Sequence, residues 1–325
     1  MGFIYSQLLA KLPYPEQPQT GRTVIITGSN TGLGKEAAKH FARLGAGRLI
    51  IAVRSISKGE AAKADIETAT KCGKDVIEVW ELDMTSFDSV KQFAKRVTKT
   101  LDRLDVFIAN AGVVRKEYHL AEGLEESITV NYISTFLLAG LVLPKMKETA
   151  NLFSIRPTLA ITSSGAHAHS SFPQKDLALE GKLIETIGDR EMCTEYRDQQ
   201  YPLSKMLEIF AVRSIGKQSP QQVFPVTINA VDPGFCHSDL AREQSSWIFS
   251  IMKTVLARTT EEGSRTLFHG GNGDRHTHGR YLSDCVVAEP DKVVTKNGDV
   301  EDKLWKELSE RLEKISPGVM ENFKA

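Results

Sequence analysis

Short runs of β-branched and apolar residues alternate with longer amphipathic segments along most of this chain. The first run, RTVIIT at residues 22–27, is followed by a glycine-rich turn and then by apolar residues at helical spacing, Ala38, Phe41 and Leu44. The same order recurs, and strands are expected at residues 22–27, 48–53, 76–82, 104–109, 158–162, 223–231 and 279–282. Helices between such strands connect them by right-handed crossovers and cover both faces of a parallel sheet. The pattern predicts a single α/β domain with a doubly wound parallel sheet of about seven strands.

The two ends of the chain are less regular than the middle. A proline-containing lead over residues 1–20 is expected to be a tail, and the domain is expected to cover residues 21–287. Residues 288–325 begin with a polar stretch and end in an amphipathic helix, which we expect to be an extension appended to the domain. Three leucines mark the apolar face of that helix, Leu304, Leu308 and Leu312.

Composition restricts the partners and the compartment. The 41 basic and 41 acidic residues cancel, so neither a nucleic-acid partner nor an anionic membrane surface is expected. The four cysteines form no CxxC pair, which fits a reducing compartment, and a cytoplasmic location is expected because the N-terminus does not resemble a secretory signal. Gly2 and Ser6 fit a myristoylation pattern, which leaves peripheral membrane association open as the alternative.

One helix is expected from about residue 124 to residue 146, with its longest apolar stretch at residues 133–143. That stretch is too short to cross a bilayer, so no transmembrane segment is expected.

The turn after the first strand is rich in glycine. Its spacing, G-x-x-x-G-x-G, lets backbone amides and a helix N-terminus approach a pyrophosphate, and the strand before it and helix after it supply the required context. A dinucleotide is therefore expected at these residues: Gly28, Ser29, Asn30, Thr31, Gly32, Leu33 and Gly34.

The residue after the second strand indicates which dinucleotide. An NAD enzyme places a carboxylate there for the ribose hydroxyls, but this chain has Arg54, whose guanidinium can pair with a 2′-phosphate. NADP(H) is therefore favoured, with a solvated surface arginine as the alternative. Two further strand ends are candidates for cofactor contacts. Asp83 and Met84 would meet the adenine, and Asn110, Ala111 and Gly112 would meet the nicotinamide-side ribose. The alternative is that both are ordinary turns.

Four residues form the candidate catalytic group. Tyr201 and Lys205 share one face of a helix, and an ammonium beside the phenol would lower its pKa from about 10 and make it an acid/base group. Pro202 is tolerated in a first turn, so Tyr201 is expected at the start of its helix. Ser164 ends a strand and could donate to a substrate oxygen, and Asn131 is either a satisfied buried amide or part of a proton relay.

After the sixth strand, a Pro-Gly turn is suited to lining the nicotinamide. The residues expected there are Pro233, Gly234, Phe235 and Ser238, preceded by Asp232. The apolar segment that follows is either core or a lid over about residues 235–258, in which Trp247 would contact a lipophilic substrate.

Histidines occur in two i, i+2 pairs, His167 with His169 and His276 with His278. Neither pair has the third ligand that zinc requires, so no metal is expected and solvated loop histidines are favoured, while His167 could line the substrate entrance.

Taken together, the motifs TGSNTGLG, NAG, Asn131, Ser164, YPLSK and DPG resemble the short-chain dehydrogenase/reductase family over residues 21–284, with a similarity to its retinol-dehydrogenase-like branch. The resemblance implies a Rossmann-like fold with Tyr201 as general acid or base, Lys205 on the ribose, Ser164 on the carbonyl and Asn131 holding a relay water.

The expected function is reduction of a ketone or aldehyde on a lipophilic small molecule with NADPH. Oxidation of a lipophilic, retinoid- or steroid-like alcohol is the alternative within the same chemistry. A non-catalytic NADP(H)-binding scaffold or sensor is the alternative from another class, against which the intact Ser164, Tyr201 and Lys205 argue. A small-molecule substrate is the expected partner, and a homodimer is left open.

Overall fold

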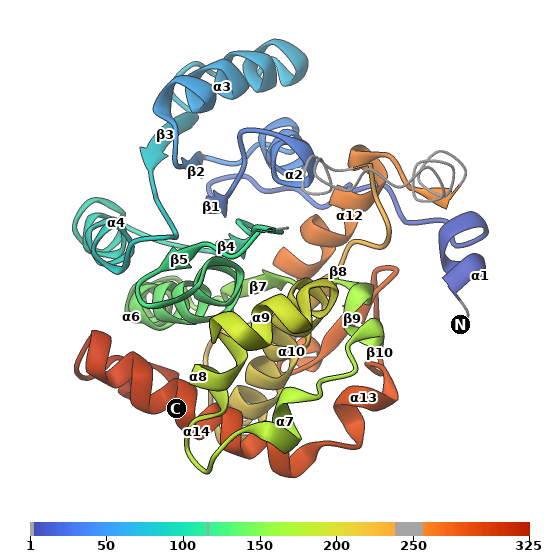
Figure 1. The fold of residues 1–325 in the computed structure, drawn as a ribbon. Helices are drawn as coiled ribbons and strands as arrows, with labels where there is room; N and C mark the ends of the chain where they lie inside the picture. Colours follow the sequence, from blue (N-terminus) through green and yellow to red (C-terminus); the bar gives the residue numbers. More distant parts are fainter. Residues whose placement is uncertain (1–2, 116, 238–255) are drawn as a thin grey trace.

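The computed structural model describes residues 3–115, 117–237 and 256–325, and its centre is a twisted sheet (Figure 1). The sheet contains eight strands in the order β10-β9-β8-β7-β4-β1-β2-β3, parallel except for β10, which pairs antiparallel with β9. The strands are β1 (Thr23–Thr27), β2 (Arg48–Val53), β3 (Ile77–Glu81), β4 (Val106–Ala109), β7 (Thr158–Thr162), β8 (Thr227–Asp232), β9 (Tyr281–Ser283) and β10 (Val286–Ala288). A separate small hairpin joins β5 (Leu120–Ala121) and β6 (Leu124–Glu125).

The α/β sheet expected from the sequence is confirmed, and the two largest differences concern β8 and β10. Strand β8 begins at Thr227 rather than at residue 223, because Pro225 has no N–H to donate and Phe224 is held in a turn on Pro220. The additional strand β10 follows a tight turn in which Asp284 and Cys285 both have positive φ. Three-residue edge strands give too short an alternation for the sequence pattern to reveal.

Helices cover both faces of the sheet (Figure 1). Before the middle of the chain these are α1 (Phe3–Leu8), α2 (Gly32–Arg43), α3 (Ile56–Thr70), α4 (Phe87–Thr100), α5 (Glu126–Ile128), the π-helix η1 (Thr129–Ser134) and α6 (Thr135–Phe153). The following helices are η2 (Gly165–His169), α7 (Gln174–Leu177), α8 (Leu183–Ile187), α9 (Arg190–Glu195), η3 (Arg197–Gln199) and α10 (Gln200–Gln218). After the gap come α12 (Thr260–Gly271), η5 (Arg275–Thr277), α13 (Lys292–Thr295), α14 (Gly298–Ile315) and η6 (Val319–Phe323).

The side chains of β1 show how the two faces differ. Ile25 points into a cluster with α4, α6, α10 and α14, whereas its neighbours Val24 and Ile26 point to the opposite face, among residues of α2, α3 and α12. All three are fully buried. Burial on both faces explains why the strands appear in the sequence as continuous apolar runs rather than as an alternating pattern.

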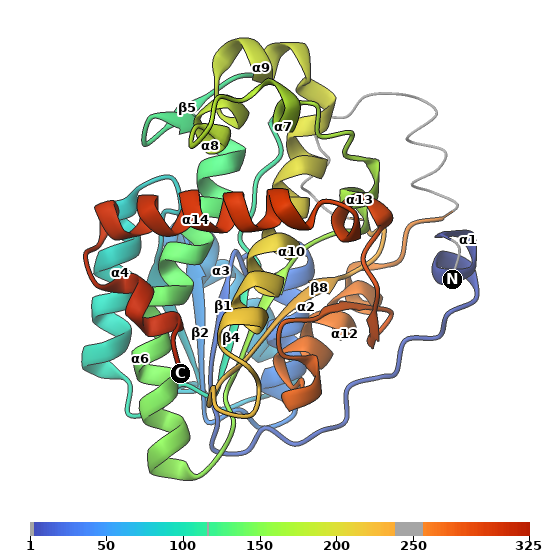
Figure 2. The ribbon, with the colours of Figure 1, turned by 90° about the horizontal axis from the view of Figure 1, so that it is seen from below.

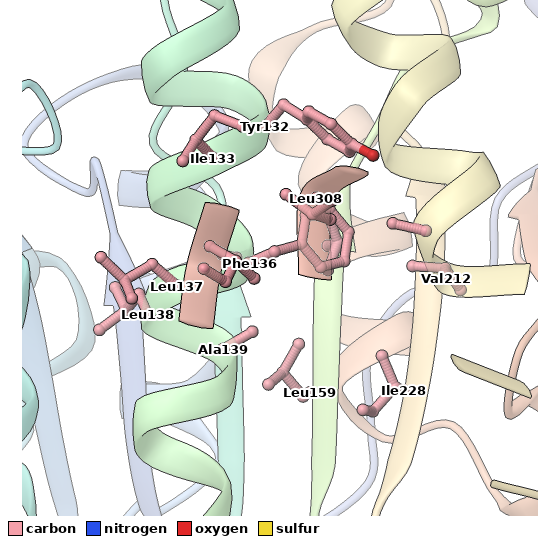
Figure 3. Packing of buried hydrophobic residues seen from close by; sticks show 14 of the residues in the cluster. Tyr132, Ile133, Phe136, Leu137, Leu138, Ala139, Leu159, Val212, Ile228 and Leu308 are labelled. Carbon is pink, nitrogen blue, oxygen red and sulfur yellow. The ribbon is translucent and has the colours of Figure 1, made fainter. Parts of the chain in front are cut away.

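The C-terminal helix α14 is part of the core, so the expectation of an appended extension is wrong. Figure 2 shows α14 running across the outside of α6 and α10. Its Leu308 is fully buried in the same cluster as Phe136 of α6 and Val212 of α10 (Figure 3). A leucine stripe on an otherwise polar helix predicts one buried face, but it does not tell which surface that face covers.

The helical run Glu126–Phe153 is apolar and long enough, by composition and length, to cross a membrane, which the sequence analysis did not anticipate. However, 89% of its most apolar window is buried inside the protein. This is the burial expected of a core helix packed against a sheet.

Strand order places the functional edge of the sheet. The connections from β1 proceed toward β3 on one side, and those from β4 proceed toward β9 on the other. Between β1 and β4 the direction of winding reverses, and in doubly wound sheets ligands bind at the carboxyl ends of strands beside such a reversal. The glycine-rich turn follows β1, and the Asn110 turn follows β4.

Candidate active site

The glycines of the turn after β1 have different surroundings: some are closely packed against other residues, and others face open space. Gly28 and Gly32 have φ of 66° and 59°, in the left-handed region that favours glycine. A Cβ on Gly34 would lie 2.5 Å from Asn110 Nδ2, whereas one on Gly32 would meet no atom within 4 Å. Gly34 therefore lets two turns touch, and Gly32 leaves the backbone approachable from outside.

Hydrogen bonds join this turn to the Asn110 turn. Asn110 Nδ2 donates to the carbonyl oxygens of Thr27 (2.9 Å) and Gly28 (3.2 Å). In return, Thr27 Oγ1 accepts from the backbone N–H groups of Asn110 (3.0 Å) and Ala111 (2.9 Å). Ser29 is fully buried and donates to the carbonyl oxygen of Ile26 at 2.7 Å. We call residues 28–34 and 110–112 the glycine edge.

The other expected cofactor residues lie at two further strand ends. Arg54 is exposed directly after β2. Asp83 follows β3, and its Oδ1 accepts from the backbone N–H (2.9 Å) and the hydroxyl (2.7 Å) of Thr85, so part of this carboxylate stabilises its own turn. Met84 is buried beside it. Contacts of Arg54, Asp83 and Met84 with a nucleotide remain predictions.

Tyr201 and Ser164 meet at the carboxyl edge of the sheet, as expected from their positions. Helix α10 begins at Gln200, so Tyr201 and Pro202 lie in its first turn, where proline is tolerated. Ser164 lies two residues after the end of β7, and its side chain is near enough to Tyr201 to lower the pKa of the phenol. The phenol and the hydroxyl can therefore act on one substrate oxygen.

Lys205 lies behind Tyr201 on the same face of α10. Its Nζ is 5.8 Å from the centroid of the Tyr201 ring. The ammonium donates to Thr162 O at 2.8 Å and to Glu208 Oε1 at 2.8 Å. Lys205 is buried and Glu208 is only 2% exposed, so this ion pair is shielded from water.

The pKa of Tyr201 corrects an expectation. We expected Lys205 to lower it, but burial of the phenol is the largest effect and raises the pKa above its ordinary value. Lys205 and Ser164 act in the opposite direction, while the Glu208 and Asp232 carboxylates raise the pKa further. In the protein alone, Tyr201 is therefore a phenol at neutral pH.

Asn131 serves the structure through its side chain. Its Oδ1 accepts from Val113 N at 2.9 Å, and its Nδ2 donates to Val113 O and to Ser204 Oγ, both at 3.0 Å. The residue is fully buried in the π-helix η1, a distortion found frequently at functional sites. The amide thus fastens the loop after Gly112 to α10, and its role in holding a relay water remains a prediction.

The Pro-Gly turn after β8 is fixed by Asp232. Its Oδ1 accepts from Gly234 N at 2.9 Å, and its Oδ2 accepts from the hydroxyls of Tyr281 (3.0 Å) and Ser283 (3.3 Å). Gly234 has φ of 78°. Asp232 therefore joins the expected nicotinamide turn of Pro233, Gly234 and Phe235 to strand β9.

Part of the expected site lies outside the described residues. Ser238, Trp247 and the stretch 238–255 of the expected lid belong to this part.

His167 is a buried structural residue, so its expected position at the substrate entrance is wrong. It is 3% exposed, its Nε2 accepts from Asp291 N at 3.0 Å, and its Nδ1 lies 2.7 Å from Ser164 O. Because Nε2 accepts, Nδ1 carries the proton and donates to Ser164 O. The ring therefore supports the residue that carries the catalytic hydroxyl, and burial lowers its pKa.

His278 is also buried rather than solvated. Its Nδ1 accepts from Ile228 N at 3.1 Å, which leaves Nε2 to donate to Ser219 O at 2.8 Å. Their partners in the i, i+2 pairs, His169 and His276, are exposed as expected. Among residues 3–115, 117–237 and 256–325, no group of three or more His, Cys, Asp or Glu side chains could hold a metal ion.

Glu208 is a residue of the site that the sequence motifs do not single out. It was visible as an acidic residue one turn after Lys205 in the otherwise apolar run MLEIFAV. We call Glu208, Asp232 and His167 the buried polar layer. Glu208 pairs with Lys205, His167 donates to the carbonyl oxygen of Ser164, and Asp232 raises the pKa of Tyr201.

The chain is similar in sequence and in fold to known short chain dehydrogenases. The family model described as short chain dehydrogenase matches residues 22–153. The chain is 54% identical to the short chain dehydrogenase/reductase dmxR8 of Cryptosporiopsis sp. (strain 8999), over 99% of this chain and 100% of that protein. It is 39% identical to the short chain dehydrogenase atnD of Emericella nidulans, over 87% of this chain and 90% of that one.

Among solved structures, the fold is similar to a short chain dehydrogenase from Escherichia coli CFT073 complexed with NADPH. The TM-score is 0.59 at 20% identity, covering 83% of this chain and 99% of the other. At this identity the likeness concerns the fold.

Proposed function

Because the chain belongs to the short-chain dehydrogenase/reductase family of oxidoreductases, we propose that it uses NADPH to reduce a ketone or aldehyde on a lipophilic small molecule. The observation on which the proposal depends is the meeting of Ser164, Tyr201 and Lys205 beside the glycine edge. A bound dinucleotide and a substrate oxygen could both be reached there. Membership of the retinol-dehydrogenase-like branch remains a prediction.

The residues of the glycine edge fit a dinucleotide. Helix α2 begins at Gly32, and the first N–H groups of a helix have no partner within it and attract phosphate. The backbone at Gly32 is open, since a Cβ would meet nothing there. Arg54, exposed after β2, could pair with a 2′-phosphate, and this supports NADPH over NADH. When bound, NADPH supplies the hydride.

The protein's own part in the reaction is to bind the carbonyl oxygen and protonate it. The Ser164 hydroxyl orients that oxygen by a hydrogen bond, and Tyr201 gives its phenolic proton to the oxygen as the carbonyl carbon accepts the hydride. Tyr201 is then a phenolate, which the Lys205 ammonium stabilises until a proton is returned. The carbon is reduced, and the product is an alcohol.

The state of Tyr201 favours reduction over the alternative direction. A general acid must hold its proton at the working pH, and a raised pKa keeps Tyr201 protonated. Oxidation would need the phenolate as base, which burial, Glu208 and Asp232 all disfavour in the protein alone.

Turnover in both directions tests the proposal. The purified protein is incubated with NADPH or NADH and a panel of lipophilic ketones and aldehydes, and separately with NADP⁺ or NAD⁺ and the matching alcohols. We expect faster consumption of NADPH than of NADH at neutral pH, and alcohol oxidation to gain only at alkaline pH. Binding of NADPH without turnover in either direction would instead support the non-catalytic scaffold.

A further inference from the structure

The Glu208 carboxylate has a position that the proposed mechanism does not yet use. It lies one helical turn after Lys205 and touches the ammonium at 2.8 Å. Its other oxygen, Oε2, is buried and has no hydrogen-bond partner within the described ranges of the chain. Burial of a carboxylate costs free energy unless the group is paired, and the charged partner of Glu208 is the Lys205 ammonium.

The ion pair fixes where the ammonium points. Lys205 Nζ has three N–H bonds, and two of them are directed to Glu208 Oε1 and Thr162 O. A Cβ on Gly112 would lie 3.8 Å from this nitrogen, so the ammonium borders the glycine edge as well as Tyr201. One N–H therefore remains for the side on which cofactor and substrate bind.

The ion pair also changes the charge that Tyr201 experiences. An isolated ammonium would favour the phenolate, but the adjacent carboxylate acts on Tyr201 in the opposite direction and offsets part of that effect. Burial raises the pKa of Glu208 to about 7, against the opposing effect of Lys205, so its charge can change within the working range.

Resting on the proposed function, we infer that Glu208 is a positioning residue of the active site: it holds the Lys205 ammonium in place and offsets its charge, so that Tyr201 keeps its proton for carbonyl reduction. It acts on Tyr201 through Lys205 and by direct repulsion, without touching the substrate.

The charged and titratable groups around Tyr201 come from three elements. Lys205 and Glu208 lie on its own helix, Asp232 ends β8, and His167 of η2 packs behind Ser164. His167 is neutral at pH 7 because burial lowers its pKa. When the charge of Glu208 is removed, one of the two carboxylates that oppose the ammonium at Tyr201 is lost, so Tyr201 should ionise at lower pH.

A spectroscopic titration tests this without any substrate. Tyrosinate absorbance is followed with rising pH in the wild type and in Glu208→Gln. The chain has 7 tyrosines. To isolate the signal of Tyr201, the same titration is recorded for each protein with Tyr201→Phe added and is subtracted. We expect the Tyr201 step at lower pH in Glu208→Gln, with several-fold more phenolate at a given alkaline pH. An unchanged step, or one at higher pH, overturns the inference.

Glu301→Gln is a matched control. Glu301 is another buried carboxylate that pairs with α10, through Arg213 Nε at 3.0 Å, and it is fully buried. It is not among the groups that act on Tyr201. The Tyr201 step should therefore stay at its wild-type pH in this variant, and a shift as large as that of Glu208→Gln would contradict the assignment to Glu208.

Two further variants keep the test decisive if Glu208→Gln does not fold. Glu208→Asp retains the charge at a greater distance, and we expect a smaller shift in the same direction. In a Lys205→Met background, where the cation is absent, changing Glu208 to Asp should move the Tyr201 step much less than it does with Lys205 present. An equal shift in both backgrounds would show that Glu208 does not act through Lys205.

Because the titration needs no turnover, its result is independent of whether the proposed reduction is observed. If reduction is observed, the alkaline limit of kcat/KM should move to lower pH in Glu208→Gln. Restoration of that limit toward the wild-type value in Glu208→Asp would distinguish a charge effect from general loosening of the site.

Discussion

The glycine edge and the buried polar layer both border the catalytic residues, and they are built in opposite ways. The glycine edge is made of backbone and of positions where a side chain is missing, such as Gly34 against Asn110. The buried polar layer is made of charged or ionisable side chains: Asp232 and His167 are held by contacts with residues far away in the chain, and Glu208 is held by its ion pair with Lys205 one helical turn away. In the proposed function the first region receives the cofactor, whereas carboxylates of the second region raise the pKa of Tyr201.

The largest expected effect concerns the group between the two regions. Tyr201→Phe removes the proton donor and should lower kcat for carbonyl reduction about 10²–10⁴-fold. NADPH affinity should change little, because the glycine edge is intact. Steady-state kinetics with a NADPH-binding titration measures both. Tyr196→Phe, a partly exposed tyrosine just before α10, is the control, and equal losses in both variants would remove Tyr201 from its role.

The glycine edge should respond to added volume. Gly34→Ala places a Cβ 2.5 Å from Asn110 Nδ2 and 2.8 Å from Gly28 O, so the two turns must separate. We expect NADPH Kd to rise about tenfold, with a free energy of unfolding lower by about 1–3 kcal/mol. Gly298→Ala, with open space around it, should change neither. Wild-type NADPH affinity in Gly34→Ala would show that contact between the turns is unimportant.

A smaller effect is expected at the periphery of the same edge. Arg54→Ala should raise the Kd for NADPH about fivefold and leave the Kd for NADH unchanged, because an exposed charge-assisted contact contributes about 1 kcal/mol. Lys58→Ala, another exposed cation, is the control. Equal weakening of both cofactors would identify Arg54 as a solvated surface residue and would remove the main sequence argument for NADP(H).

A last effect concerns stability rather than activity, through His167 of the buried polar layer and through His278. Burial lowers the pKa of His167 and His278, so the unfolded chain binds more protons than the folded one below pH 6.5. The contribution of these neutral histidines to the free energy of unfolding should therefore be fully present above pH 6.5. It should decrease on acidification, by at most about 1.4 kcal/mol per pH unit for each histidine.

Denaturant unfolding at a series of pH values measures this dependence. His167→Gln should flatten it, while His169→Gln, at an exposed position, should leave it as in the wild type. If the free energy of unfolding of the wild type increases as the pH is lowered from 6.5 to 5, the assignment of neutral buried histidines is contradicted.

The same contrast explains how much the sequence could predict. The strands near the glycine edge, the turn Gly28–Gly34 and the pair Tyr201 and Lys205 are local patterns, and the structure places them where their spacing suggested. The position of Asn110 beside this turn was predictable because parallel strands end at the same edge of the sheet. Periodicity and short motifs report on residues close together in the chain.

The buried polar layer depends on partners far away in the chain. His167 is buried and accepts a hydrogen bond from Asp291, which lies 124 residues later, and the sequence around His167 gives no sign of this contact. Leu308 joins the core beside α6 and α10 for the same reason, so the C-terminal helix seemed an appendage in the sequence alone. Glu208 was locally visible, but its effect on Tyr201 required the distance to Lys205 Nζ.

The most direct test follows the transferred hydride in the presence and in the absence of the proton donor Tyr201. NADPH deuterated at the transferable position is mixed with the protein and a reducible ketone, and the product alcohol is examined by mass spectrometry for wild type and Tyr201→Phe. The account predicts one deuterium on the carbinol carbon with wild type and almost no labelled alcohol with Tyr201→Phe. Labelled product formed equally fast by both proteins would contradict Tyr201 as the proton donor, and its absence from both while NADPH binds would contradict the proposed reduction.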